Sequence, residues 1–275
     1  MTSERARRPG PSVRTRVVEH TAEREMPRED RLITEEPLEI RVRAGALDAR
    51  RAWVTMRTPG HDFELAAGWL VNEGLAAPGA IAQVAYCTDA DLAPEQEFNV
   101  VTVTLTGDAD LPHRHVAASA GSSACGVCGK DSIAEALATR TAKTWSGARP
   151  SADVVRRLPE ALRERQTLFR TTGGVHAAGL AGADGALQVV REDVGRHNAV
   201  DKVVGARVLA GEQPSAACLV LSGRVGFELV QKAAASGIGS IVAVGAPTSL
   251  AARLAGEAGI DLWGFTSPGR TVRYG

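Results

Sequence analysis

Ser240-Ile241-Val242-Ala243-Val244 is an almost wholly apolar run near the C-terminal end of the chain. Helical stretches flank it: one spans about residues 226–236 and closes at Gly237, and the other spans 249–258 and begins at Pro247-Thr248-Ser249. Two similar runs lie beyond these helices, Ala217-Cys218-Leu219-Val220-Leu221 and Ile260-Asp261-Leu262-Trp263-Gly264-Phe265. Apolar strands that alternate with helices are typical of a parallel sheet covered on both faces. We therefore predict an α/β fold with a mostly parallel sheet.

Working outward, the segment before these strands predicts a hairpin and a helix. Residues 175–181 and 187–191 read as strands that flank Ala183-Asp184-Gly185, which predicts a hairpin turn. A charged turn over 192–197 leads into a helix from about Asn198, with Val200, Val203 and Val204 facing inward.

The N-terminal half predicts a smaller, β-rich portion. Residues 37–42 and 52–56 alternate as a strand hairpin, and residues 98–105 form another strand. Between them, 62–74 shows a helical stripe, with Asp62 placed to cap its start and Gly74 to end it.

Composition suggests three segments. Residues 1–31 hold eight Arg and six acidic residues with few large apolar ones, which predicts a disordered tail. An internal boundary is expected near 150, where Pro150-Ser151 opens a helical pair that is interrupted at Pro159 and reads as a solvated connector. The prediction is an α+β portion over 32–150 and an α/β portion over 151–275, or one continuous domain.

Charge and cysteine content exclude several classes of protein. Thirty-two basic and 32 acidic residues leave no bulk field for nucleic acid or a membrane. Four cysteines do not make a disulfide framework, and no apolar run is long enough to span a bilayer. A cytoplasmic protein is expected.

A C-x-x-C pair, Cys125 and Cys128, lies in the small-residue stretch 121–130 at the end of a long loop (107–130). The stretch 131–138 reads as a helix, whose unpaired N–H groups and dipole favour thiolate over thiol, and Lys130 adds a cation. The C-x-x-C spacing alone is compatible with four roles: a reactive thiol, half of a zinc site, a dithiol redox pair, or simple packing. Zinc would need scattered further ligands, from the set Cys87, Cys218, His113, His115, His176 and His197.

The turns after the predicted strands suggest an anion-binding edge. In such sheets ligands bind beyond the carboxyl ends of the strands, against helix N-termini. Arg196, Arg224 and Arg270 each follow a glycine in these turns, and Thr248 begins the next helix. His176 is a further candidate to reach the same crevice. No Walker A or G-x-G-x-x-G motif is present, which argues against an ordinary ATPase or NAD enzyme. The expected ligand is a large anion that carries a nucleotide.

These residues resemble a known family, the formate dehydrogenase accessory sulfurtransferases (FdhD/NarQ), over about 32–275. The motifs that carry the resemblance are Glu36-Pro37-Leu38-Glu39-Ile40, residues 65–74, residues 125–130, residues 172–178, the run 191–202, Ser222-Gly223-Arg224, residues 246–251, and Gly264-Phe265 with Gly269-Arg270.

The resemblance implies a sulfur carrier. A cysteine desulfurase would load Cys125 as a persulfide, Cys128 would assist or share it, and the sulfur would pass to the bis-molybdopterin guanine dinucleotide cofactor of formate dehydrogenase. The family's cofactor-holding segment falls on Phe265, Thr266, Ser267, Pro268, Gly269 and Arg270. A core similar to cytidine deaminase, a homodimer, and no metal or tightly bound cofactor are also implied.

Three alternatives stay open. A zinc deaminase would carry Glu and Pro where this chain has Ala178 and Ala124. A thiol–disulfide oxidoreductase would use the same cysteines in turnover. A chaperone would bind the cofactor without sulfur transfer.

Overall fold

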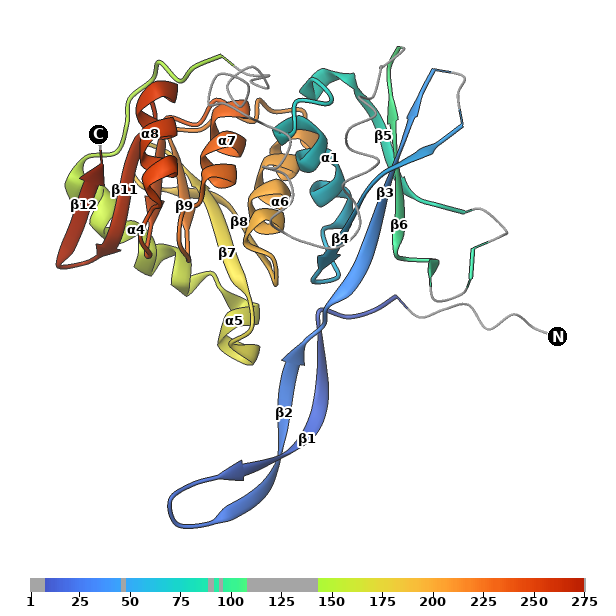
Figure 1. The fold of residues 1–275 in the computed structure, drawn as a ribbon, viewed down its shortest axis with the longest axis vertical. Helices are drawn as coiled ribbons and strands as arrows, with labels where there is room; N and C mark the ends of the chain where they lie inside the picture. Colours follow the sequence, from blue (N-terminus) through green and yellow to red (C-terminus); the bar gives the residue numbers. More distant parts are fainter. Residues whose placement is uncertain (1–7, 46–47, 89–91, 94–95, 108–142, 275) are drawn as a thin grey trace.

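The computed structural model describes residues 8–45, 48–88, 92–93, 96–107 and 143–274. In this part of the chain, a six-stranded sheet and a four-stranded sheet lie on opposite sides of a central helix pair, and a two-stranded hairpin projects from the body (Figure 1). None of the helices in these residues has the length and apolar character needed to cross a bilayer. The division into two portions near residue 150 remains a prediction.

The six-stranded sheet has the order β12-β11-β10-β9-β7-β8. Its strands are β7 (His176–Ala181), β8 (Leu187–Asp193), β9 (Cys218–Leu221), β10 (Ser240–Ala243), β11 (Asp261–Ser267) and β12 (Arg270–Tyr274). β8, β9, β10 and β11 run in one direction, whereas β7 and β12 run against their neighbours. The mostly parallel sheet is thus corrected to a mixed one, because short turns join β7 to β8 and β11 to β12 and force antiparallel pairing.

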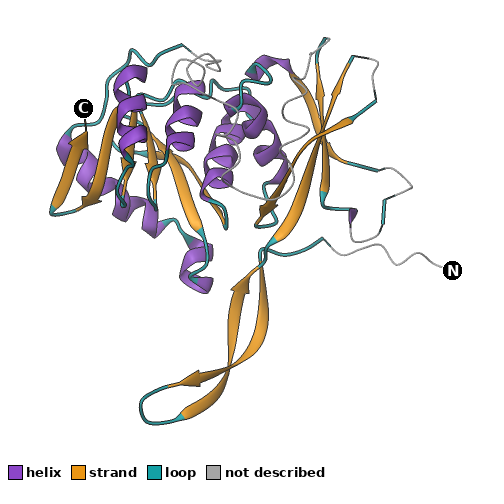
Figure 2. Ribbon diagram, in the orientation of Figure 1, coloured by secondary structure: helices purple, strands orange, loops and turns teal. Residues whose placement is uncertain are grey.

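Helices cover both faces of this sheet, as expected (Figure 2). The helices α6 (Arg196–Leu209), α7 (Phe227–Ala235) and α8 (Ser249–Ala258) pack on one face in the largest apolar core. On the other face, α4 (Ala152–Glu164) buries Val155, Leu158 and Leu162 against the strands, and the short α5 (Thr167–Thr172) follows. The prediction of a solvated connector interrupted at Pro159 was therefore wrong, because α4 continues through Pro159 and belongs to the core.

The four-stranded sheet has the order β4-β3-β6-β5. It consists of β3 (Glu36–Ala44), β4 (Arg50–Arg57), β5 (Ile81–Tyr86) and β6 (Val100–Leu105), with the one-turn helix η1 (Pro78–Ala80) before β5. α1 (Asp62–Asn72) packs on it, and the rings of Trp53 and Trp69 stack with centroids 5.0 Å apart. Asp62 does not cap α1 as predicted. His61 holds the cap position, and the Asp62 carboxylate instead accepts hydrogen bonds from Arg57 and Tyr86.

α1 and α6 cross where each helix has a glycine. A Cβ placed on Gly68 would lie 1.8 Å from the carbonyl oxygen of Asp201, and one on Gly205 would lie 1.8 Å from that of Glu64. Both contacts are with backbone atoms, so the two helix axes approach as closely as their main chains allow. We call this crossing the α1–α6 seam; it joins the four-stranded sheet to the six-stranded one.

The predicted disordered tail was wrong for residues 12–31. They belong to an antiparallel hairpin of β1 (Ser12–His20) and β2 (Glu25–Ile33), here called the arm. Ion pairs cross the arm, such as Arg14–Glu29 at 3.8 Å and Arg28–Glu19 at 3.5 Å. Composition cannot reveal such pairing, because it records how much apolar surface a segment has and not what its strands bond to. At the base of the arm, Ile33 lies against Gly174.

Candidate functional site

The carboxyl ends of β8, β9, β10 and β11 meet at one edge of the six-stranded sheet, because these strands share a direction. Backbone hydrogen bonds link the turns that follow β9, β10 and β11: Gly245 N–H donates to the Gly223 carbonyl, and Phe265 N–H donates to the Gly245 carbonyl, each at 3.1 Å. His176, the first residue of β7, lies at the same edge beside Gly223. Three of the predicted turns are therefore continuous, and His176 lies between them and the turn after β8 that carries Arg196. We call this row of turns the strand-end site.

Glycines in this row let the turns pack on one another. A Cβ on Gly245 would lie 2.9 Å from the Gly223 carbonyl oxygen, and one on Gly264 would lie 2.8 Å from Pro247 Cδ. In the structure, Gly245 and Gly264 are explained by contact between neighbouring turns, and the exposed cations are the groups left to meet a ligand.

Three arginines predicted to bind anions reach the strand-end site. Arg196, in the first turn of α6, Arg224, after β9, and Arg270, at the start of β12, are all exposed. Within the described ranges, none of the three forms an ion pair with a carboxylate. Guanidinium groups without acid partners are suited to phosphate oxygens, which they bind in pairs of hydrogen bonds. Thr248 differs, because its hydroxyl accepts from Ala251 N–H at 3.2 Å and caps α8.

The segment 265–270 contains a strained aromatic residue. Phe265 has a φ of 49° and remains 45% exposed. A bulky side chain at positive φ is costly, and such residues cluster at binding sites. The Arg270 guanidinium carbon lies 5.5 Å from the centre of the Phe265 ring. An exposed ring beside an exposed cation can stack on a planar base while the cation meets its phosphate.

The other residues of this segment form the β11–β12 turn. Thr266 is buried and shares a 3.0 Å hydrogen bond with the Thr271 hydroxyl, so it supports the turn. Ser267, Pro268 and Gly269 are exposed. The six predicted residues are thus brought together, with Thr266 turned inward.

His176 is half-buried at the strand-end site. Burial lowers the pKa of its imidazole below the usual value, and the nearby Arg196 and His197 lower it further, while Asp193 opposes them. At neutral pH the ring is accordingly uncharged, and it can both donate and accept a hydrogen bond.

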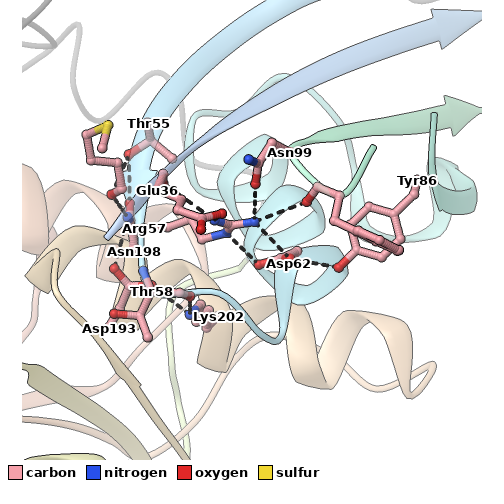
Figure 3. Close-up of polar contacts among 12 residues, drawn as sticks. Glu36, Thr55, Arg57, Thr58, Asp62, Tyr86, Asn99, Asp193, Asn198 and Lys202 are labelled. Atoms are coloured by element: carbon pink, nitrogen blue, oxygen red, sulfur yellow. Dashed lines mark hydrogen bonds and ion pairs between the residues drawn. The ribbon is translucent and has the colours of Figure 1, made fainter. Parts of the chain in front are cut away.

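A buried polar network behind the strand-end site was missed by the sequence interpretation. The carboxylate of Asp193 and the ammonium of Lys202 are fully buried and 2.6 Å apart. Figure 3 shows this pair with Thr58 and Asn198. A signal was available: Asp201 and Lys202 stand between Val200 and Val203, on a helix whose valines were predicted to face inward.

The predicted carriers of sulfur, Cys125 and Cys128, lie outside the described residues, as do His113 and His115. Cys87 and Cys218 are buried, and burial raises the pKa of the Cys218 thiol well above its usual value, which makes it unreactive. Ala178, where a deaminase would place its Glu, is fully buried in β7 opposite Leu221. In the ranges that the structure covers, His, Cys, Asp and Glu side chains make no group of three suited to a metal ion.

The chain is 44% identical to a protein of Nocardia farcinica named Sulfur carrier protein FdhD, over 92% of this chain and 89% of that protein. It is 45% identical to the protein of that name from Streptomyces coelicolor (86% and 84%) and 42% identical to the one from Mycobacterium tuberculosis (91% of each).

A solved structure shares the fold. The crystal structure of a putative formate dehydrogenase accessory protein from Desulfotalea psychrophila superposes with a TM-score of 0.72 at 23% identity, over 96% of each chain. Residues 33–275 match the FdhD/NarQ family, a range that takes in both sheets, the α1–α6 seam and the strand-end site. The chain belongs to the FdhD/NarQ family.

Proposed function

We propose that this protein is a sulfur carrier that sulfurates the bis-molybdopterin guanine dinucleotide cofactor for formate dehydrogenase. The observation that carries the proposal is the 42–45% identity, over most of the chain, to proteins named Sulfur carrier protein FdhD. The Cys125–Cys128 pair and the basic strand-end site support it, because a carrier needs a nucleophilic sulfur and a place for its recipient.

The loading step is a thiol exchange. The Cys125 thiolate attacks the terminal sulfur of a persulfide on a cysteine desulfurase, a new S–S bond forms at Cys125, and the desulfurase cysteine leaves as a thiolate. Delivery of that sulfur as sulfide takes two electrons. Cys128 supplies them by attacking the inner sulfur of Cys125 and closing a disulfide, which a cellular thiol then reduces. The chain is in this sense a sulfurtransferase.

The cofactor is the recipient and is held by its nucleotide end. Arg224 and Arg270 bind diphosphate oxygens at the strand-end site, Arg196 adds a third cation, and Phe265 offers its exposed ring to the guanine. From the family resemblance we further propose a homodimer in the cytoplasm, built around a core similar to cytidine deaminase.

Sulfur loading tests the carrier half of the proposal. Incubation with a cysteine desulfurase and cysteine should add one sulfur atom to the protein, and a reductant should remove it. Cys125→Ala should not gain the sulfur, whereas Cys218→Ala, which removes a buried and unreactive thiol, should load like the wild type. Intact-mass spectrometry measures both. Loading of Cys125→Ala at the wild-type level would contradict the proposal.

Guanosine diphosphate tests the ligand half. The wild type should bind it, and Arg270→Ala should raise the dissociation constant about tenfold, because a charge-assisted hydrogen bond to phosphate is lost. Arg253→Ala, which removes a charge from α8 outside the strand-end turns, is the matched control and should bind like the wild type. Calorimetric titration at fixed salt is the measurement. Equal binding by the Arg270 and Arg253 variants would remove Arg270 from the site.

A further inference from the structure

We infer that Asp193 is a positioning residue, which together with Lys202 fixes the first turn of α6 so that Arg196 stays at the strand-end site. The inference rests on the proposed function, because it concerns how the nucleotide end of the cofactor is held. Neither residue is exposed, so neither is expected to touch the ligand itself.

The Asp193 carboxylate organises the turn that carries Arg196. One oxygen accepts from Gly195 N–H at 2.8 Å and from Asn198 Nδ2 at 3.1 Å, and both donors flank Arg196 in sequence. Gly195 is the N-cap of α6 and has no side chain to bond the free N–H groups of the helix. A carboxylate two residues upstream therefore supplies the anchor that the cap residue lacks.

The other carboxylate oxygen ties this turn to the N-terminal half. It accepts from Thr58 N–H at 3.2 Å and pairs with Lys202 Nζ at 2.6 Å, while Lys202 also donates to the Thr58 carbonyl at 2.9 Å (Figure 3). The Thr58 hydroxyl in turn accepts from Val194 N–H at 3.0 Å. The 193–196 turn is thus held from three directions, and the first turn of α6 cannot shift while these bonds persist.

The same helix provides an internal comparison. Asp201 on α6 pairs with Lys232 on α7 at 2.9 Å, and both side chains are buried. Asp201 also accepts a hydrogen bond from Asn72, and Lys232 also pairs with Glu73 at 3.0 Å, but none of these contacts reaches the 193–196 turn. A purely structural role would make the two pairs equivalent in any binding assay, so they separate positioning from stability.

The test compares two double variants by calorimetric titration with guanosine diphosphate. Asp193→Asn with Lys202→Met, and Asp201→Asn with Lys232→Met, each replace a buried ion pair by neutral groups of similar volume, which is tolerated better than removing one partner. The Asp193/Lys202 double variant should raise the dissociation constant about tenfold, because Arg196 is no longer held where it can bind the phosphate. The second should change it by less than about twofold.

The effect of Arg196→Ala on binding, measured in the wild type and in the Asp193/Lys202 variant, is a readout that a loss of stability alone would not change. In the wild type this substitution should weaken binding about tenfold, and in the Asp193/Lys202 variant it should add less than about twofold, because the arginine is already misplaced. Thr58→Val, a milder loosening of the same turn, should weaken binding about threefold and serves if the double variant does not fold.

The outcomes are distinguishable. Wild-type affinity in the Asp193/Lys202 variant, equal losses in both double variants, or a full tenfold effect of Arg196→Ala in that background would each overturn the positioning role. For an unfolded double variant, an unchanged affinity in Thr58→Val does so. A wild type that binds no guanosine diphosphate would sink the ligand half of the proposed function as well, whereas sulfur loading of Cys125 tests the carrier half independently.

Discussion

Gly205→Ala should lower the free energy of unfolding by about 3 kcal/mol or more, at the upper end of what overpacking costs. The new methyl group would lie 1.8 Å from the Glu64 carbonyl oxygen and 2.8 Å from Gly68 N, so it meets the backbone of α1 and not a side chain that can rotate away. This steric overlap can be relieved only if the two helices of the α1–α6 seam move apart. Because this seam joins the two sheets, packing on both sides of it is disturbed.

The matched control is Gly256→Ala in α8. A Cβ there meets nothing within 4 Å, and alanine favours a helix over glycine by about 0.5–1 kcal/mol. Thermal melts should therefore move in opposite directions: down by about 6–12 °C for Gly205→Ala and up by about 1–4 °C for Gly256→Ala. If both variants melt above the wild type, the close helix crossing is not present in solution.

Arg57→Met is the second change with a large expected effect, about 3–5 kcal/mol of lost stability. The Arg57 side chain is fully buried, and its guanidinium donates to Asp62 through Nε at 2.9 Å and to Asn99 Oδ1 at 2.9 Å (Figure 3). Without it, the buried Asp62 carboxylate keeps only the Tyr86 hydroxyl, at 2.7 Å, as a side-chain donor among those in Figure 3. An uncompensated buried charge is more costly than the ion pair was favourable.

Arg51→Met provides the comparison within the same strand. Arg51 is 55% exposed and pairs with Glu39 at 3.9 Å, a geometry that contributes less than about 1 kcal/mol. Urea unfolding of both variants, followed by tryptophan fluorescence, measures the difference directly. Similar midpoints for the two variants would show that the Arg57–Asp62 pair does not control the stability of this region.

The central α/β architecture could be predicted from sequence, because β9, β10 and β11 are short apolar runs bounded by clear helix signals. Their common direction also brought the strand-end turns together, since parallel strands end at the same edge. The antiparallel strands β7 and β12 were not placed in the sheet, because strand order depends on pairing between distant residues and leaves no local pattern.

Polar residues of the core were the main omission. Asp193, Lys202 and Arg57 read as surface residues in a single sequence, because charged side chains are rarely buried unless paired. Several of their partners lie far away in the chain, for example Thr58 for Lys202 and Asn99 for Arg57, so this pairing follows from the fold and cannot precede it. The arm was missed for the same reason: its ion pairs form only once the two strands are in register.

The α1–α6 seam also constrains how the protein can mature during synthesis. The glycine-bearing surface of α1 leaves the ribosome well over a hundred residues ahead of its only comparably close partner in the described chain, α6. At the usual 5–20 residues per second, this surface waits on the order of ten seconds without cover. Translation speed and holding chaperones should therefore affect the yield of this protein more than that of a chain whose packed helices are neighbours in sequence.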